Sequence, residues 1–261
     1  MCYVGRAMPD SDLKFLNPPI VESIFDIECD FHPGFQLSGF QEEAAQLFKD
    51  TYSKARKVMF QTHQFKYGKD SPPQQTVMEG GIQALQHFTE DEKQLVQIRN
   101  SGYSFNRLAP YTSLDDYLPE IEKTWGLFVE LVNPIQIRAI RLRYINRILL
   151  PLESGGVQLD SYLKMAPQLP EEDSFSLTGF LNQYQAEDLE TGNQVNIVLT
   201  AQPKEGNILP VIFDSTVLAP TQSRPDDWES IKGKILVLRE LKNRIFLKVL
   251  TQKCLDLFQQ P

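Results

Sequence analysis

Apolar and polar residues alternate along several segments, most clearly from Pro134 to Pro151. Alternation with period two is the pattern of a β-strand with one buried face. The phase of the pattern changes at Ala139, which predicts a β-bulge there, because one extra residue lets the alternation resume out of step. This phase change places the arginines of the segment together on its polar face: Arg138, Arg141, Arg143 and Arg147.

A second alternating segment, Ile20 to Phe31, has carboxylates where the other has arginines. Its apolar face includes Phe25, Ile27 and Cys29, which predicts a strand with that face in the core. The opposite face is acidic and consists of Glu22, Asp26, Glu28 and Asp30. The two segments therefore have complementary charges at the same two-residue spacing.

The remaining patterns predict further strands and several helices. Strands are expected near residues 58–67, 76–88, 93–99, 103–108, 175–184, 194–202 and 209–218. Apolar residues at three- and four-residue spacing predict helices over 41–56, 113–132, 159–165 and 226–258, with Ser113 as the cap of the second. The predicted class is α+β, with curved antiparallel sheets packed on long helices.

A short internal repeat suggests two similar halves. Leu108-Ala109-Pro110 precedes Asp115-Asp116, and Leu218-Ala219-Pro220 precedes Asp226-Asp227, so each strand would end in Leu-Ala-Pro before an acidic helix start. Duplication and shared turn chemistry both explain the match. The halves would be residues 13–133 and 134–261, within one continuous globular unit. Their element order resembles that of TATA-binding-protein-like saddles and of helix-grip folds.

Composition narrows the functional classes. The chain has 261 residues, a formal net charge of −8 and 41% hydrophobic residues, enough for a packed core. The negative charge disfavours a surface that coats nucleic acid. The three cysteines, Cys2, Cys29 and Cys254, are far apart and odd in number, which favours a reducing compartment without disulfides. Neither a secretory signal nor a membrane-spanning run is recognisable, so a cytoplasmic protein is expected.

Three segments together resemble a known protein family: Asn17 to Glu22, Phe105 to Tyr111, and Arg141 to Arg147. The chain is similar to a sporadically distributed, functionally uncharacterised family of bacterial proteins of similar length. The resemblance covers nearly the whole chain and is weakest in the final helix. Patchy occurrence of this kind implies a partner-dependent accessory role, such as defence. The resemblance supplies no catalytic residues.

The arginine row has three interpretations. It pairs with the acidic strand in a cross-strand ladder, it binds phosphate or nucleic acid through the planar guanidinium groups, or it binds an acidic protein. Tyr144 and Asn146 belong to the apolar face of the same strand. A buried amide needs hydrogen-bond partners, so Asn146 is satisfied by neighbouring backbone or marks a polar pocket.

Motifs for catalysis, cofactors and metals are not recognisable. The sequence has no Gly-x-Ser-x-Gly elbow, no Cys-x-x-Cys, no His-Glu-x-x-His and no phosphate loop. Cys29 and His32 are near one another, but Cys29 belongs to the predicted core face, where a thiol is usually inert. A dispersed active site built from distant residues stays compatible with the sequence.

The sequence thus predicts a non-enzymatic cytoplasmic protein that binds a macromolecular partner, in a defence, antitoxin or chaperone-like accessory role. The partner is expected to be a protein, with a homodimer as a further option and no membrane. The first alternative is nucleic-acid or nucleotide binding through the arginine row. The second is a small-ligand pocket between the sheet and the C-terminal helix.

Overall fold

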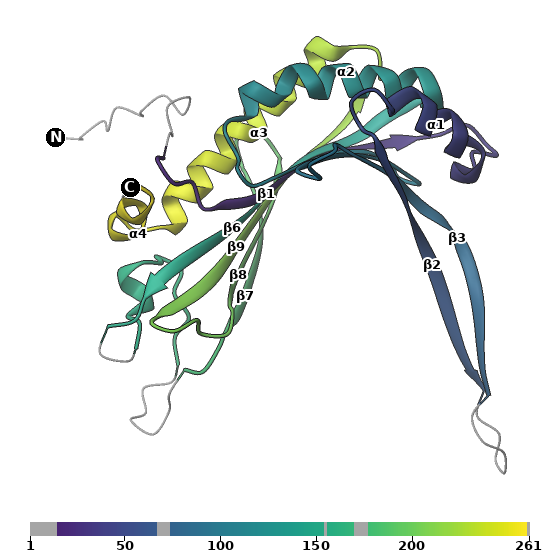
Figure 1. Cartoon of the computed structure of the whole chain (residues 1–261). Helices are drawn as coiled ribbons and strands as arrows, with labels where there is room; N and C mark the ends of the chain where they lie inside the picture. Colours follow the sequence, from purple (N-terminus) through teal and green to yellow (C-terminus); the bar gives the residue numbers. More distant parts are fainter. Residues whose placement is uncertain (1–14, 67–73, 154–155, 170–176, 260–261) are drawn as a thin grey trace.

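Nine strands form one antiparallel sheet in the computed structural model of the chain (Figure 1). The structure describes residues 15–66, 74–153, 156–169 and 177–259. The strands are β1 (Ile20–Asp30), β2 (Lys54–Lys66), β3 (Gln74–Phe88), β4 (Gln94–Arg99), β5 (Gly102–Leu108), β6 (Gln136–Pro151), β7 (Leu181–Glu187), β8 (Gln194–Ala201) and β9 (Ile208–Ser223). Their order in the sheet is β2-β3-β4-β5-β1-β6-β9-β8-β7, so β1 and β6 pair at its centre.

The helices gather on one side of this sheet. They are α1 (Gln41–Phe48), α2 (Leu114–Val132), α3 (Trp228–Val249) and α4 (Gln252–Asp256). Figure 1 shows the sheet arching beneath α1, α2 and α3, with an open concave face on the other side. The predicted α+β class with an antiparallel sheet is confirmed. Among the described helices, none combines the length and apolarity needed to cross a membrane.

The core lies between the helices and the apolar face of the strands. Phe25 and Ile27 of β1 are buried there, as the alternation predicts. Tyr103 of β5 packs its ring edge-on against Trp125 of α2, and its hydroxyl lies 2.6 Å from that of Thr124. The aromatic side chains of β5 and α2 therefore fasten the first long helix to the sheet.

The predicted bulge in the arginine strand is present. In the pairing of β1 with β6, Glu28 lies opposite Ala139 and Cys29 lies opposite Ile137, so Arg138 is the extra residue. The pairing of β6 with β9 shifts at the same place. Ala139 and Ile140 are consecutive and both buried, which is the change of phase seen in the sequence.

The final helical stretch is interrupted, contrary to the prediction of one helix over 226–258. Leu250 is extended, with φ −96° and ψ 145°, and forms an isolated β-bridge with Leu163. Thr251 then caps the short α4, accepting a hydrogen bond from the backbone N–H of Cys254. A tertiary backbone contact thus overrides the helical pattern at this point.

Several other predicted boundaries were wrong. The strand expected near 175–184 is β7, Leu181–Glu187; residues 177–180 belong to no strand, and 175–176 lie outside the described residues. The first helix ends at Phe48, and β2 begins at Lys54. The segment predicted as a helix over 159–165 contains only a 3₁₀ turn, Leu159–Ser161. β9 continues through Pro220, which lies opposite Ala139 and does not end the strand.

Strands β2 and β3 continue beyond the rest of the sheet as a two-stranded ribbon, which we call the arm (residues 54–66 and 74–88). β4 pairs with β3 from Ala84 to Phe88, so among the described strands none flanks the outer part of the arm. The β2–β3 register shifts between Val58 and Gln61, across from the Gly80–Gly81 doublet. Irregularities of this kind bend a ribbon, and the arm curves down beside the concave face (Figure 1).

Gly102 is a position where no side chain fits. Its φ is +144°, and a Cβ would collide with the backbone carbonyl of Ile27. We expect Gly102→Ala to destabilise the fold by about 3 kcal/mol or more in urea denaturation. Gly126→Ala is the matched control, because Gly126 is helical and open space surrounds it, so the change should stabilise by about 0.5–1 kcal/mol. A Gly102→Ala protein as stable as wild type would contradict the close approach of β1 and β5.

His87 is a buried histidine whose ring stacks on Phe48, with the ring centres 5.2 Å apart. Neither ring nitrogen has a hydrogen-bond partner among the described residues. Burial lowers the pKa of His87 to about 4 from its ordinary 6.5, so the unfolded chain binds this proton more readily than the folded one. Stability should fall as the pH drops from about 6.5 to about 4, by on the order of 3 kcal/mol. His87→Leu should remove that loss, measured as unfolding free energy against pH; an unchanged pH dependence would contradict it.

Candidate functional site

The arginine row lies on the concave face, and its first two members pair with β1. The Nε of Arg138 lies 3.1 Å from a carboxylate oxygen of Asp30. Arg141 reaches two carboxylates, with one guanidinium nitrogen 2.5 Å from Glu28 and another 3.4 Å from Asp26. β1 and β6 are antiparallel neighbours, so these contacts join side chains across adjacent strands.

The other two arginines pair with one carboxylate of β9 and one of the loop between β8 and β9. Arg143 makes a two-pronged contact with Asp214 of β9, through Nε at 3.0 Å and Nη2 at 2.5 Å. Arg147 donates to Glu205 at 2.5 Å and to the side-chain oxygen of Gln202 at 3.1 Å. The ion pairs therefore extend over three strands, β1, β6 and β9.

Asp26 is the most enclosed carboxylate of this set, with 5% of its surface exposed. Two guanidinium groups contact it, since Arg99 of β4 lies 3.0 Å away and Arg141 approaches from the other side. The hydroxyl of Ser104 donates a further hydrogen bond. A buried carboxylate is stable only when it is paired and hydrogen-bonded, and this one is both.

We call this network the ladder: Arg99, Arg138, Arg141, Arg143 and Arg147 with Asp26, Glu28, Asp30, Asp214 and Glu205. Three of the four carboxylates expected to face the arginines do so. Glu22 instead accepts a hydrogen bond from the amide of Asn106 at 2.8 Å. The sequence interpretation missed Asp214 and Glu205. The only available signal for Asp214 was its position as a single charge in an otherwise apolar strand.

Charge balance determines what the ladder can do chemically. Five guanidinium groups meet five carboxylates, and each arginine has at least one acidic partner. A phosphate would have to displace a carboxylate from its guanidinium. The concave face is therefore polar and richly hydrogen-bonded, without an excess of positive charge.

Tyr144 and Asn146 lie on the opposite face of β6, away from the ladder. Both are buried beneath α3, where they line a cavity of about 640 Å³. The structure thus separates the six predicted binding residues into two groups. The arginines face the concave side, and the tyrosine and the amide face the helices.

The remaining candidates for chemistry have structural surroundings. Burial raises the pKa of the Cys29 and Cys254 thiols to about 12 in each case, which keeps them protonated and unreactive. Asp115 forms an ion pair with Arg239 at 2.7 Å. Within the described ranges, no three or more His, Cys, Asp or Glu side chains are grouped so that they could hold a metal ion.

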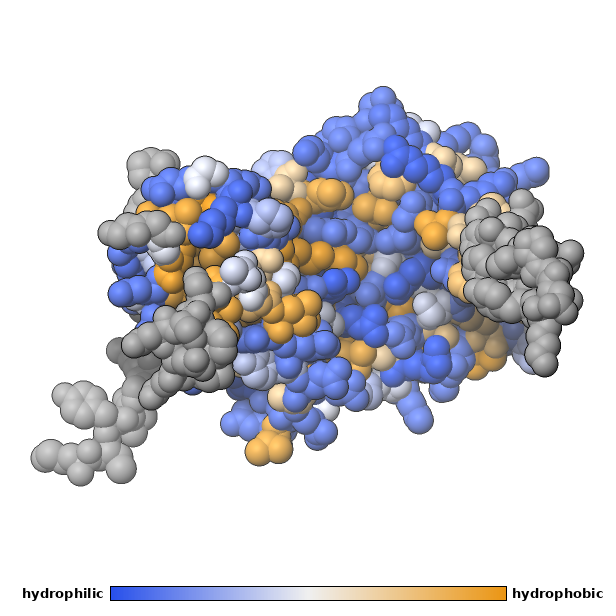
Figure 2. Space-filling view, turned by 90° about the horizontal axis from the view of Figure 1, so that it is seen from below, coloured by the Kyte–Doolittle hydropathy of each residue, from blue (hydrophilic) through white to orange (hydrophobic). Residues whose placement is uncertain are grey.

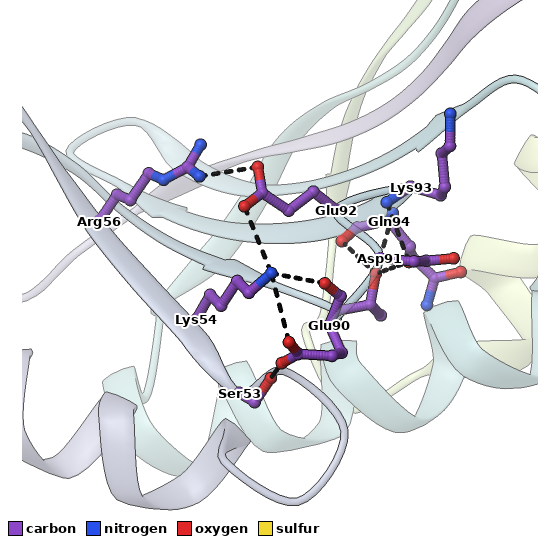
Figure 3. Close-up of polar contacts among 9 residues, drawn as sticks. Ser53, Lys54, Arg56, Glu90, Asp91, Glu92, Lys93 and Gln94 are labelled. Atoms are coloured by element: carbon purple, nitrogen blue, oxygen red, sulfur yellow. Dashed lines mark hydrogen bonds and ion pairs between the residues drawn. The ribbon is translucent and has the colours of Figure 1, made fainter.

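A separate ion-pair cluster lies at the root of the arm (Figure 3). Arg56 of β2 contacts Glu92 of the β3–β4 turn at 2.7 Å, and Lys54 lies within 3.5 Å of both Glu90 and Glu92. Ser53 also donates to Glu90 at 2.7 Å. The hydrogen bond from Arg56 lowers the pKa of Glu92, so the cluster stays charged and tethers β2 to the turn.

No protein-family model matches the chain, and no curated protein matches it in sequence.

Removing one rung tests whether the ladder stabilises the sheet. Arg141→Met deprives Asp26 and Glu28 of a shared partner, and we expect a loss of about 1–3 kcal/mol in urea denaturation. Arg224→Met is the control, since Arg224 is largely exposed and pairs with Asp226, two residues away; its cost should stay below about 0.5 kcal/mol. Equal effects of the two changes would show that the ladder adds no more than a surface ion pair.

Proposed function

We propose that this chain is a non-enzymatic binding protein that takes up another protein on its concave face. The observation that carries the proposal is the open arch itself. No α-helix of the described residues covers the underside of the sheet, and the arm descends along one side of it (Figure 1). A sheet face left open in this way offers a broad, pre-formed surface to a partner.

The arm supports this proposal because it is poorly supported within the monomer. A two-stranded ribbon in water is marginally stable unless something packs against it. Three consecutive apolar residues of β2, Val58, Met59 and Phe60, are 37%, 52% and 51% exposed. Consecutive residues of a strand point to opposite faces, so a protein held against the arm would cover some of these side chains.

The charge pattern favours a protein over nucleic acid. The arginines of the ladder are already neutralised, and the chain carries a net charge of −8. A polyanion needs excess positive charge, whereas a protein surface can match a mixed one. Figure 2, which looks onto the underside, shows such a mixture, with hydrophobic bands between hydrophilic areas.

The wider context belongs to the same proposal. The resemblance to a sporadically distributed bacterial family supports an accessory role in the cytoplasm, such as defence, an antitoxin or a chaperone-like function. Relatedness of the two segments, 13–133 and 134–261, is also proposed. The strand order supports it, because the first strand of each segment pairs with the last, β1 with β5 and β6 with β9.

Affinity purification of the tagged chain from its native host tests the proposal. We expect a protein to copurify in stoichiometric amount and to be lost at least about tenfold in a Met59→Thr/Phe60→Thr variant, because hot spots are buried apolar anchors. Val237→Ala is the control, since Val237 is 42% exposed on α3, on the helix side of the sheet. Mass measurement in solution tells whether the partner is a second copy.

Three results would overturn the proposal. The partner could be retained equally by the arm variant, which would place its contact elsewhere. Nucleic acid could copurify and be lost in Arg141→Glu/Arg143→Glu, which would favour the arginine row as a nucleic-acid site. Turnover of a substrate that one side-chain change abolishes would make the protein an enzyme.

A further inference from the structure

Strand β7 forms one edge of the sheet, at the end of the arch away from the arm (Figure 1). Every residue of this strand except Asn182 is exposed. Large apolar side chains are exposed in it and beside it, namely those of Leu177, Leu181, Tyr184 and Leu189. An exposed edge of this kind is a surface to which another strand can add.

The pairing of β7 with β8 shows which of its backbone groups face outward. Ala201 donates its N–H to the carbonyl of Phe180, and Asp188 donates its N–H to the carbonyl of Asn193. Hydrogen-bonded positions alternate along an antiparallel strand, so the even-numbered residues of β7 bond to β8. The outward N–H and C=O groups are those of Leu181, Gln183, Gln185 and Glu187. Among the described strands, none lies on that side to pair with them.

The two edges of the sheet differ in their protection against pairing. β7 contains no proline, lysine or arginine, and its register with β8 is regular. β2, at the other edge, carries Lys54, Arg56 and Lys57, and its register with β3 is irregular. Positive charges and bulges are the usual means by which natural sheets prevent edge pairing. One edge is therefore protected and the other is open.

Contacts within the monomer already hold the β7–β8 hairpin in shape. Arg244 of α3 forms an ion pair with Asp188, at the start of the turn. Gly192 returns a backbone hydrogen bond to the carbonyl of Asp188 at 2.7 Å. The amide of Gln183 donates to that of Asn196 in β8 at 2.8 Å. Because the edge is pre-formed, a strand that pairs with it pays little ordering entropy.

The sequence of β7 is complementary to itself in the antiparallel direction. When Tyr184 is set opposite its own copy, Gln183 lies opposite Gln185 of the second copy, and Leu181 lies opposite Glu187. The residues with outward backbone groups then meet one another, so each N–H faces a C=O. The two Glu187 carboxylates would be about 20 Å apart, six residue steps along the strand, beyond the screening length at physiological salt.

Tyr184 is suited to the centre of such a pairing. It lies opposite Ile197 of β8 and therefore on the face that β8 turns to the core, yet 40% of its surface is exposed. In the self-pairing it would form a non-hydrogen-bonded pair with its own copy, the arrangement that brings side chains closest. Cross-strand aromatic pairs of this kind stabilise sheets.

We propose that two copies of this chain pair through their β7 edges, antiparallel about a two-fold axis at Tyr184. The occupant is a second copy because the outward groups, the single charge and the aromatic side chain of β7 all find their match in β7 itself. The two sheets become one, with the protected β2 edges at its ends, so assembly stops at two copies. The proposal is separate from the partner surface under the arch, since it does not involve the arm.

Sedimentation velocity over a series of protein concentrations tests the proposal. We expect an equilibrium between monomer and dimer and no larger species. The dissociation constant should be on the order of micromolar, because a single strand edge makes a small interface.

Two variants that differ in one charge test the register. Gln183→Lys/Gln185→Lys sets lysine opposite lysine across the axis, and we expect dimerisation to weaken about tenfold or more. Gln183→Lys/Gln185→Glu is the matched control, because the same pairing sets lysine opposite glutamate, and it should dimerise at least as tightly as wild type. The first variant changes the net charge from −8 to −6, so overall repulsion does not explain weaker pairing.

A backbone variant tests whether the outward N–H groups form the contact. Gln185→Pro removes one of them and leaves the bonds of β7 to β8 in place, because proline is tolerated where the N–H faces solvent. We expect a monomer with unchanged thermal stability. Met59→Thr/Phe60→Thr alters the arm at the other edge and should dimerise like wild type.

Several outcomes would overturn the proposal. A chain that stays monomeric throughout the series, or that forms larger assemblies, contradicts a closed pair. A dimer that tolerates Gln183→Lys/Gln185→Lys or Gln185→Pro lies at another surface. Equal loss in the two charge variants contradicts the antiparallel register. Loss of the dimer in the arm variant would place the second copy under the arch. Partner capture is measured separately, so either proposal can fail without the other.

Discussion

The pairing of β1 with β6 is the interaction on which the rest of the structure depends. Every other strand joins the sheet through one of these two, β5 through β1 and β9 through β6. Each central strand presents apolar side chains to the helices and charged ones to the concave face. Because Asp26 is nearly enclosed, its charge must be compensated by its two guanidinium contacts when β1 pairs with β6. The ladder therefore restricts the register of the sheet centre, since a shift by one residue would bury the charged side chains.

The same arrangement gives the molecule two faces with different character. The concave face is polar, broad and balanced in charge, and the arm adds exposed apolar side chains beside it. On the helix side, α3, the N-terminal segment and the turn after β5 line a cavity. The β6 strand contributes to both faces, with Arg143 on the concave side and Tyr144 on the helix side.

Much of this could be predicted from the sequence because alternation is a local property. It located the bulge at Ala139, the buried face of β1 and the face on which the arginines lie. The partners of those arginines were only half predictable, because Asp214 and Glu205 are brought to them by strand order. The break at Leu250 depends on a bridge to Leu163, and no periodicity contains that contact. The cavity likewise arises from four segments far apart in the chain, although the buried amide of Asn146 gave a partial signal.

The central position of β1 also has a consequence for the order of events during synthesis. Ile27 pairs with Tyr103 and with Ile140, which follow it by 76 and 113 residues. At roughly 5–20 residues per second, β1 would wait on the order of ten seconds after leaving the ribosome before both neighbours exist. During that interval it is an unpaired strand with one apolar face, and such strands tend to pair with strands of other nascent chains. The four carboxylates of its outer face then act as gatekeepers, because two copies of β1 laid side by side would set like charges against each other.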